Sequence, residues 1–148
     1  MAQVVVAPNQ YPHEGFKVYL AGAIDMGDAE NWQQDVISRF AGIEEMVLLN
    51  PRRSKFTDAM EQAQIEWELE AMDDADLIFM WFPKESEAPI SLLEMGLYLR
   101  SGKLLLGVEV GYYRQRNIEL TARRYNVTVF YSLDDLVQQV KNRLNQST

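Results

Sequence analysis

The chain has 148 residues, a length that suits one ordinary domain and allows a sizeable buried core. Hydrophobic residues make up 47% of it and charged residues 24%, which indicates a globular protein and excludes a disordered one. The formal net charge of −8 argues against binding to a nucleic-acid polymer, because a phosphate backbone calls for a basic face, and is compatible with a small neutral substrate.

The predicted elements alternate between strands and helices. The first 15 residues contain Pro8 and Pro12 and are predicted to form an N-terminal arm with a candidate edge strand at residues 4–7. Beyond the arm, short apolar runs predict strands, and apolar residues at helical spacing predict helices. In chain order, the pattern predicts a strand at 16–22, a helix at 31–40, a strand at 46–49, a helix at 58–74, a strand at 75–82, a helix at 89–100, a strand at 104–108, a helix at 118–125, a strand at 127–131 and a helix at 133–144.

This order predicts an α/β fold, with a doubly wound parallel sheet of five strands in a single domain over residues 16–148. The nearly continuous apolar run at residues 75–82 is typical of a strand buried on both faces of such a sheet. Ligands of these sheets bind outside the carboxyl ends of the strands. Polar residues that follow the strands are therefore the first candidates for a site.

The composition also limits the chemistry. The absence of cysteine excludes disulfides and thiolate chemistry, and His13 in the arm is the only histidine, so we expect neither a Ser-His-Asp triad nor a metal site. Carboxylates remain as the candidate catalytic groups. Because no apolar run approaches the roughly 20 residues that cross a bilayer and the first residues lack a signal-peptide pattern, we expect a cytoplasmic protein without a membrane partner.

The loop after the first strand contains Gly22 and Asp25. Glycine lets a backbone approach a ligand closely, although a plain tight turn would explain Gly22 equally well. The spacing matches neither a dinucleotide-binding fingerprint nor a phosphate-binding P-loop. No Arg or Lys occurs between residues 21 and 34, so a phosphate bound here would need a cation from elsewhere in the chain.

Glu94 follows the third strand, early in the predicted helix, and lies between Leu93 and Met95. A carboxylate in an apolar run is unusual, because burying a charge is unfavourable, and an ionised carboxylate is a competent nucleophile toward a sugar anomeric carbon. The alternative is a solvated helix glutamate. The acidic residues between 61 and 76 are interpreted mostly as the solvated face of a helix, from which one could reach a pocket.

Three motifs, in this order and spacing, resemble the nucleoside 2-deoxyribosyltransferases and the related deoxynucleoside 5′-monophosphate N-hydrolases. The motifs are Val18-Tyr19-Leu20-Ala21-Gly22, Ala75-Asp76-Leu77-Ile78 and Leu93-Glu94-Met95-Gly96-Leu97. The resemblance extends over about residues 16–130 and implies a flavodoxin-like parallel sheet. It implies that Glu94 is the nucleophile, which attacks C1′ of the deoxyribose, expels the base and forms a covalent glycosyl-enzyme. A second base or water then takes the sugar, and the chemistry requires neither a metal nor an organic cofactor.

The resemblance also implies roles for other residues. Tyr19 matches a tyrosine near the nucleophile, and Glu68 stands where the family usually has an aspartate that contacts the base. Ala88 stands where some members have a second active-site aspartate. Asn117 resembles an asparagine that a neighbouring subunit lends to the pocket, which implies a homo-oligomer with shared active sites.

Asp25 and Ser91 are expected, from their positions, to line the sugar side of the pocket. The leading hypothesis is a transferase whose partners are a deoxynucleoside and a free nucleobase. A monophosphate N-hydrolase is the first alternative, disfavoured because Ile24 to Gly27 offer no serine or arginine and Asp25 would repel a phosphate. A non-catalytic nucleotide-binding domain is the second alternative, since a fold alone does not confer function.

Overall fold

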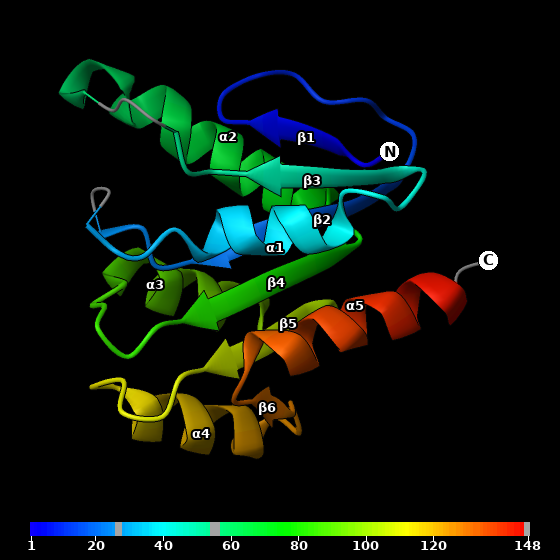
Figure 1. Cartoon of the computed structure of the whole chain (residues 1–148). Coiled ribbons are helices and arrows are strands. Elements are labelled where there is room, and N and C mark those ends of the chain that lie inside the picture. Colours follow the sequence, from blue (N-terminus) through cyan, green and yellow to red (C-terminus); the bar gives the residue numbers. More distant parts are fainter. Residues whose placement is uncertain (26–27, 54–56, 147–148) are drawn as a thin grey trace. The chain divides into compact units, whose positions relative to one another are not determined.

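The computed structural model describes residues 1–25, 28–53 and 57–146. Its strands form one sheet in the order β1-β3-β2-β4-β5-β6 (Figure 1). The strands are β1 (Gln3–Val6), β2 (Phe16–Gly22), β3 (Met46–Asn50), β4 (Leu77–Phe82), β5 (Leu104–Val108) and β6 (Val129–Phe130). The α-helices are α1 (Trp32–Phe40), α2 (Glu61–Asp74), α3 (Pro89–Tyr98), α4 (Gln115–Arg124) and α5 (Leu133–Gln146), and a 3-10 turn at Asp58–Met60 precedes α2.

The α/β class is confirmed, but the sheet has six strands and not the predicted five. The additional strand is β1, which pairs in parallel with β3 from Gln3 opposite Val47 to Val6 opposite Asn50. The candidate edge strand in the arm is therefore a full member of the sheet. Without β1, the strand order is the one typical of flavodoxin-like sheets, with its reversal beside β2.

Several predicted boundaries change for local reasons. β4 begins at Leu77 because the Ala75 N–H still bonds the carbonyl of Ala71 and so closes α2. β6 is shorter than predicted because the Val127 N–H bonds the Ala122 carbonyl in the turn after α4. α4 begins three residues earlier than predicted, because its polar and mostly exposed first turn carries no apolar signal.

The chain divides into two compact units. Unit one comprises Met1–Leu20 and Asn31–Ile78, in which β3 pairs in parallel with both β1 and β2. In Figure 1, α1 lies in front of β2 and α2 passes behind β3. Trp67 of α2 secures the arm, since its indole N–H donates to the Asn9 carbonyl at 2.8 Å.

Unit two comprises Ala21–Glu30 and Phe79–Thr148, and its core is built around β4 and β5. Every residue of both strands is buried, as expected for strands covered on both faces. Gly107 of β5 packs against Leu136 of α5 and the Trp81 ring. These side chains are so close that a Cβ atom at residue 107 would have no room. Among the described residues, no helix is long and apolar enough to cross a membrane.

We predict that Gly107→Ala destabilises the protein by about 1–3 kcal/mol, because overpacking a filled core forces neighbouring side chains to move. An added Cβ would lie 2.8 Å from Trp81 Cε3 and 2.5 Å from Leu136 Cδ1. Gly42→Ala is the control, since a Cβ there meets nothing within 4 Å. Urea unfolding followed by circular dichroism measures both variants, and equal stabilities would contradict the packing argument.

Candidate functional site

Glu94 lies on the buried face of α3. This helix begins with Pro89, whose missing N–H and fixed φ suit a first turn. Ser91, Glu94 and Met95 face inward, and the Glu94 side chain is only 7% exposed, whereas the neighbouring Leu93 is 61% exposed. The interpretation of Glu94 as a solvated helix glutamate is therefore wrong. Ser91 lies almost one turn before Glu94 on the same face, so the helix brings these two predicted residues together.

The loop before α3 is tightly fixed. The Ser86 hydroxyl donates to the Pro83 carbonyl at 2.6 Å, and the Tyr112 hydroxyl donates to the Glu87 carbonyl. The Tyr112 ring packs on Phe82 with the ring centroids 5.2 Å apart. Burial raises the pKa of the Tyr112 phenol, so it stays protonated and able to donate. The entry into α3 is thus anchored to the end of β4 and to the segment after β5.

Asp25 forms a second anchor for the same loop. Its two carboxylate oxygens accept the N–H groups of Glu87 and Ala88, each at 2.8 Å. Ala88, where the resemblance implies a second active-site aspartate in some family members, is thus bound through its backbone N–H by a carboxylate from the loop after β2. Met26 and Gly27, the rest of the predicted Ile24–Gly27 segment, lie outside the described residues.

Gly22 and Asn117 complete the predicted residues of unit two. Gly22 ends β2 with a φ of 135°, a conformation that favours glycine, and it is buried. Asn117 lies in the first turn of α4 and is exposed, as a side chain offered to a neighbouring subunit would have to be. Its assignment to a shared pocket stays a prediction.

Tyr19 and Glu68 belong to unit one. Tyr19 is 1% exposed on β2, and its ring centroid is 6.2 Å from that of Trp67. Glu68 is half-buried on α2, while the other acidic residues from 61 to 76 are exposed, as predicted for a solvated face. Burial raises the pKa of the Glu68 carboxyl, against smaller opposing effects of a hydrogen bond from Gln64 and the charge of Arg53. Among the acidic residues from 61 to 76, Glu68 is therefore the one that is partly buried. The helical spacing of the sequence alone could not identify it.

Two arginines at the carboxyl end of β3 were missed by the sequence interpretation. The Arg52 guanidinium donates to the side-chain amide oxygen of Gln33 at 3.1 Å, and Arg53 Nε donates to the side-chain amide oxygen of Gln64 at 2.7 Å. Both glutamines are buried. The rule that ligands bind at carboxyl ends of strands could have found the arginines, because they directly follow Asn50 and Pro51.

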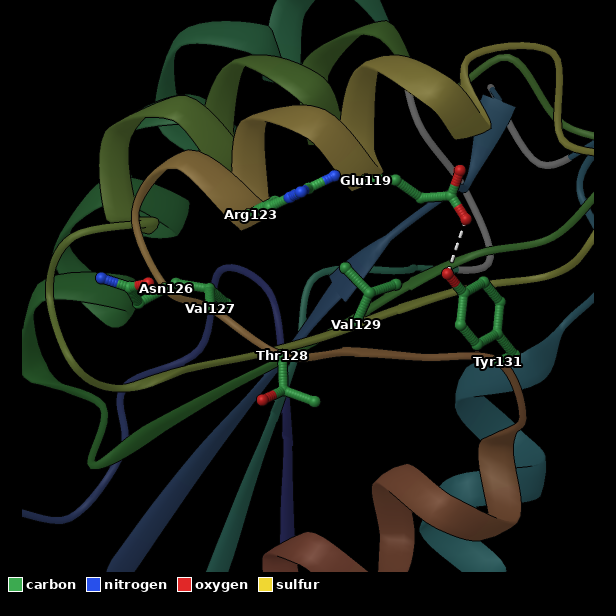
Figure 2. A pocket seen from close by; sticks show the side chains of 7 residues that line it. All are labelled: Glu119, Arg123, Asn126, Val127, Thr128, Val129 and Tyr131. Atoms are coloured by element: carbon green, nitrogen blue, oxygen red, sulfur yellow. Dashed lines mark hydrogen bonds between the residues drawn. The ribbon is translucent and has the colours of Figure 1, made fainter.

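A separate open pocket of about 450 Å³ lies in unit two, between α4 and the edge strand β6 (Figure 2). Its lining residues are Glu119, Arg123, Asn126, Val127, Thr128, Val129 and Tyr131. The Glu119 carboxylate accepts the Tyr131 hydroxyl, and this bond, with a second from Gln115, lowers the pKa of that carboxyl. None of the predicted site residues lines the pocket. Within the described ranges, no group of three or more His, Asp or Glu side chains is placed to hold a metal ion.

The raised pKa of Glu68 predicts a pH-dependent stability. The folded state holds the proton more tightly than the unfolded state, so the free energy of unfolding falls as pH rises from the unfolded to the folded pKa of Glu68. Glu68→Gln should remove this decrease. We expect the variant to gain stability relative to the parent protein between pH 4 and pH 8 in urea titrations, with Glu66→Gln, an exposed neighbour, as control. A constant difference between parent and variant across this range would contradict the assignment.

The comparison with protein families identifies the family of the chain. The family model described as "Nucleoside 2-deoxyribosyltransferase like" matches residues 15–112, well over half of the chain. The matched range contains Glu94 and every other predicted site residue except Asn117. No curated protein matches the chain. Because a family model matches most of its length, the chain belongs to the nucleoside 2-deoxyribosyltransferase-like family.

Proposed function

We propose that the protein exchanges the base of a 2′-deoxynucleoside and that the Glu94 carboxylate is its nucleophile. Family membership supports an enzyme that acts on deoxynucleosides. The observation that carries the choice of residue is the burial of Glu94 on the inner face of α3. A carboxyl group buried at such a cost in desolvation is best explained by a reaction that uses it.

The proposed reaction has two steps at C1′ of the sugar. In the first, a Glu94 oxygen forms a bond to C1′ while the bond from C1′ to the base nitrogen breaks, and its electron pair leaves with the base, which takes up a proton. In the second, a nitrogen of another base forms a bond to C1′ while the bond from C1′ to the Glu94 oxygen breaks, which frees the carboxylate, and the proton of the attacking nitrogen passes to the group that protonated the first base. Two displacements at one carbon retain its configuration, as in retaining glycosidases.

The remaining residues take supporting roles in this proposal. Glu68 is the candidate donor to the leaving base, because its raised pKa favours a protonated carboxyl. Ser91 is assigned to the sugar side, Tyr19 to the neighbourhood of the nucleophile, and Gly22 to a close approach of the backbone to the ligand. Asn117, exposed on α4, is assigned to the pocket of a neighbouring subunit, so the active form is a homo-oligomer.

We predict that Glu94→Ala lowers base exchange by at least about 10³-fold, because removal of a nucleophile leaves only binding and positioning. The assay mixes deoxyinosine or thymidine with free adenine and follows new deoxynucleosides by chromatography. Glu85→Ala, an exposed acid on the loop before α3, is the matched control and should keep near-parental activity. Full retained exchange by Glu94→Ala would refute the nucleophile.

Hydrolysis of a deoxynucleoside 5′-monophosphate is a second candidate function, favoured by Arg52 and Arg53. Each guanidinium is oriented by a buried neutral amide oxygen, that of Gln33 or of Gln64. The two guanidinium groups place positive charge at the carboxyl end of β3. The loop after β2, by contrast, contains no Arg or Lys. Arginine at such an edge suits bidentate binding of a phosphate.

Comparing a deoxynucleoside with its 5′-monophosphate separates the two candidates. If the arginines bind phosphate, Arg53→Gln should lower kcat/KM for the monophosphate at least tenfold more than it lowers kcat/KM for the deoxynucleoside, because any effect of Arg53 on Glu68 acts on both substrates alike. Arg39→Gln, which removes an exposed pair with Asp35, is the control. Equal effects of Arg53→Gln on both substrates would exclude phosphate binding by this residue.

A further inference from the structure

We infer that Asp25 is a positioning residue that sets the start of α3 and thereby the direction in which Glu94 points. The inference rests on the proposed role of Glu94. The position of Asp25 in the sequence predicts a contact with the sugar, but both of its carboxylate oxygens accept backbone N–H groups, from Glu87 and Ala88. These residues lie 62 and 63 positions away in the sequence, so the contact joins the loop after β2 to the loop after β4.

The backbone at this junction needs an external restraint. Ala88, which immediately precedes α3, has a φ of 53°, and Asp25 itself has a φ of 49°. A left-handed conformation is unfavourable for alanine, since its Cβ approaches the following carbonyl, and is better tolerated by aspartate. Ala88 has no side chain that could stabilise this conformation. The bond from its N–H to a carboxylate oxygen, strengthened by the negative charge, supplies the restraint.

The peptide groups at residue 87 are held from two directions. The Glu87 N–H donates to Asp25, and the Glu87 carbonyl accepts the Tyr112 hydroxyl. These bonds fix two consecutive peptide planes just before the helix. The loop therefore has one orientation at the point where α3 begins.

The start of α3 determines where Glu94 points. The Ala88 carbonyl accepts the Leu92 N–H at 3.1 Å and so opens the hydrogen-bond ladder of the helix. Because successive side chains are rotated by about 100° around the axis, a changed first turn would rotate Ser91 and Glu94 together. A shift of about 1 Å at a reacting group can cost about 10²-fold in rate. Asp25 thus acts on the nucleophile through the backbone and not through the substrate.

The test compares Asp25→Ala with Asp28→Ala, which removes an exposed carboxylate of the same loop. For Asp25→Ala we expect kcat for base exchange, or for hydrolysis if that is the reaction, to fall about 10- to 100-fold, while KM for the deoxynucleoside stays within about threefold. Asp28→Ala should change neither constant more than twofold. A large rise in KM with little change in kcat would instead place Asp25 on the substrate and overturn the inference.

A second substitution distinguishes positioning from a general loss of structure. Glycine adopts a positive φ readily, so Asp25→Ala combined with Ala88→Gly should recover at least threefold of the lost kcat. The double variant recovers nothing if Asp25 acts on the substrate or merely stabilises the fold. Urea unfolding of each variant confirms that the protein is folded at the assay temperature.

Amide hydrogen exchange keeps the inference testable if the proposed function fails. Should the parent protein show no turnover, Asp25→Ala should still accelerate exchange at Glu87, Ala88 and the first turn of α3 at least tenfold, and Asp28→Ala should leave it unchanged. Unchanged exchange in Asp25→Ala would overturn the positioning role. Accelerated exchange without turnover would refute the proposed enzyme and retain the anchor.

Discussion

The burial of the Glu94 carboxyl is the constraint on which the interpretation of unit two depends. Burying a carboxyl group on the inner face of a helix costs desolvation free energy, so its surroundings have to hold it in place and compensate this cost. α3 meets the first condition through its fixed entry, where Asp25 and Tyr112 hold the loop before the helix. The inner face then presents Ser91 and Glu94 in one direction, while Leu93 remains outside.

Unit one supplies groups of a different chemistry. The pKa of Glu68 is raised because its carboxyl group is partly removed from water. The side-chain amide of Gln64 donates to Glu68 and accepts from Arg53, so it connects the two charged groups. A carboxyl group with a raised pKa suits proton exchange with a nucleobase, whereas a guanidinium suits a phosphate. The net charge of −8 therefore does not describe the local charge at the carboxyl end of β3, and an acidic protein can still bind an anionic substrate.

The sequence was most informative where apolar residues form continuous runs. The predicted strands at Phe16–Gly22 and Leu104–Val108 match the structure at both ends, because each apolar run is bounded by loop-forming residues. β1 was predicted only as a candidate, because four residues in a proline-containing arm carry little signal until β3 pairs with them. The burial of Glu94 could be inferred only as one of two alternatives, since an apolar run of that length does not say which side of the helix faces the core.

The anchor at Asp25 could not be predicted from spacing. Its two hydrogen bonds join loops that are more than sixty residues apart in the sequence. They also depend on a left-handed backbone conformation at Asp25 and Ala88, which the residue types do not predict. Arg52 and Arg53 were predictable in principle, because they follow a strand directly, although the loop after β2 contains no Arg or Lys.

The most direct test of the central claim is to trap the intermediate. The protein is mixed with a deoxynucleoside, quenched in acid during steady-state turnover, digested and mapped by mass spectrometry. We predict a deoxyribosyl ester on the peptide that contains Glu94, with the modification on that side chain. Turnover with the ester on another carboxylate, or with inverted configuration at C1′ and no ester, would contradict it.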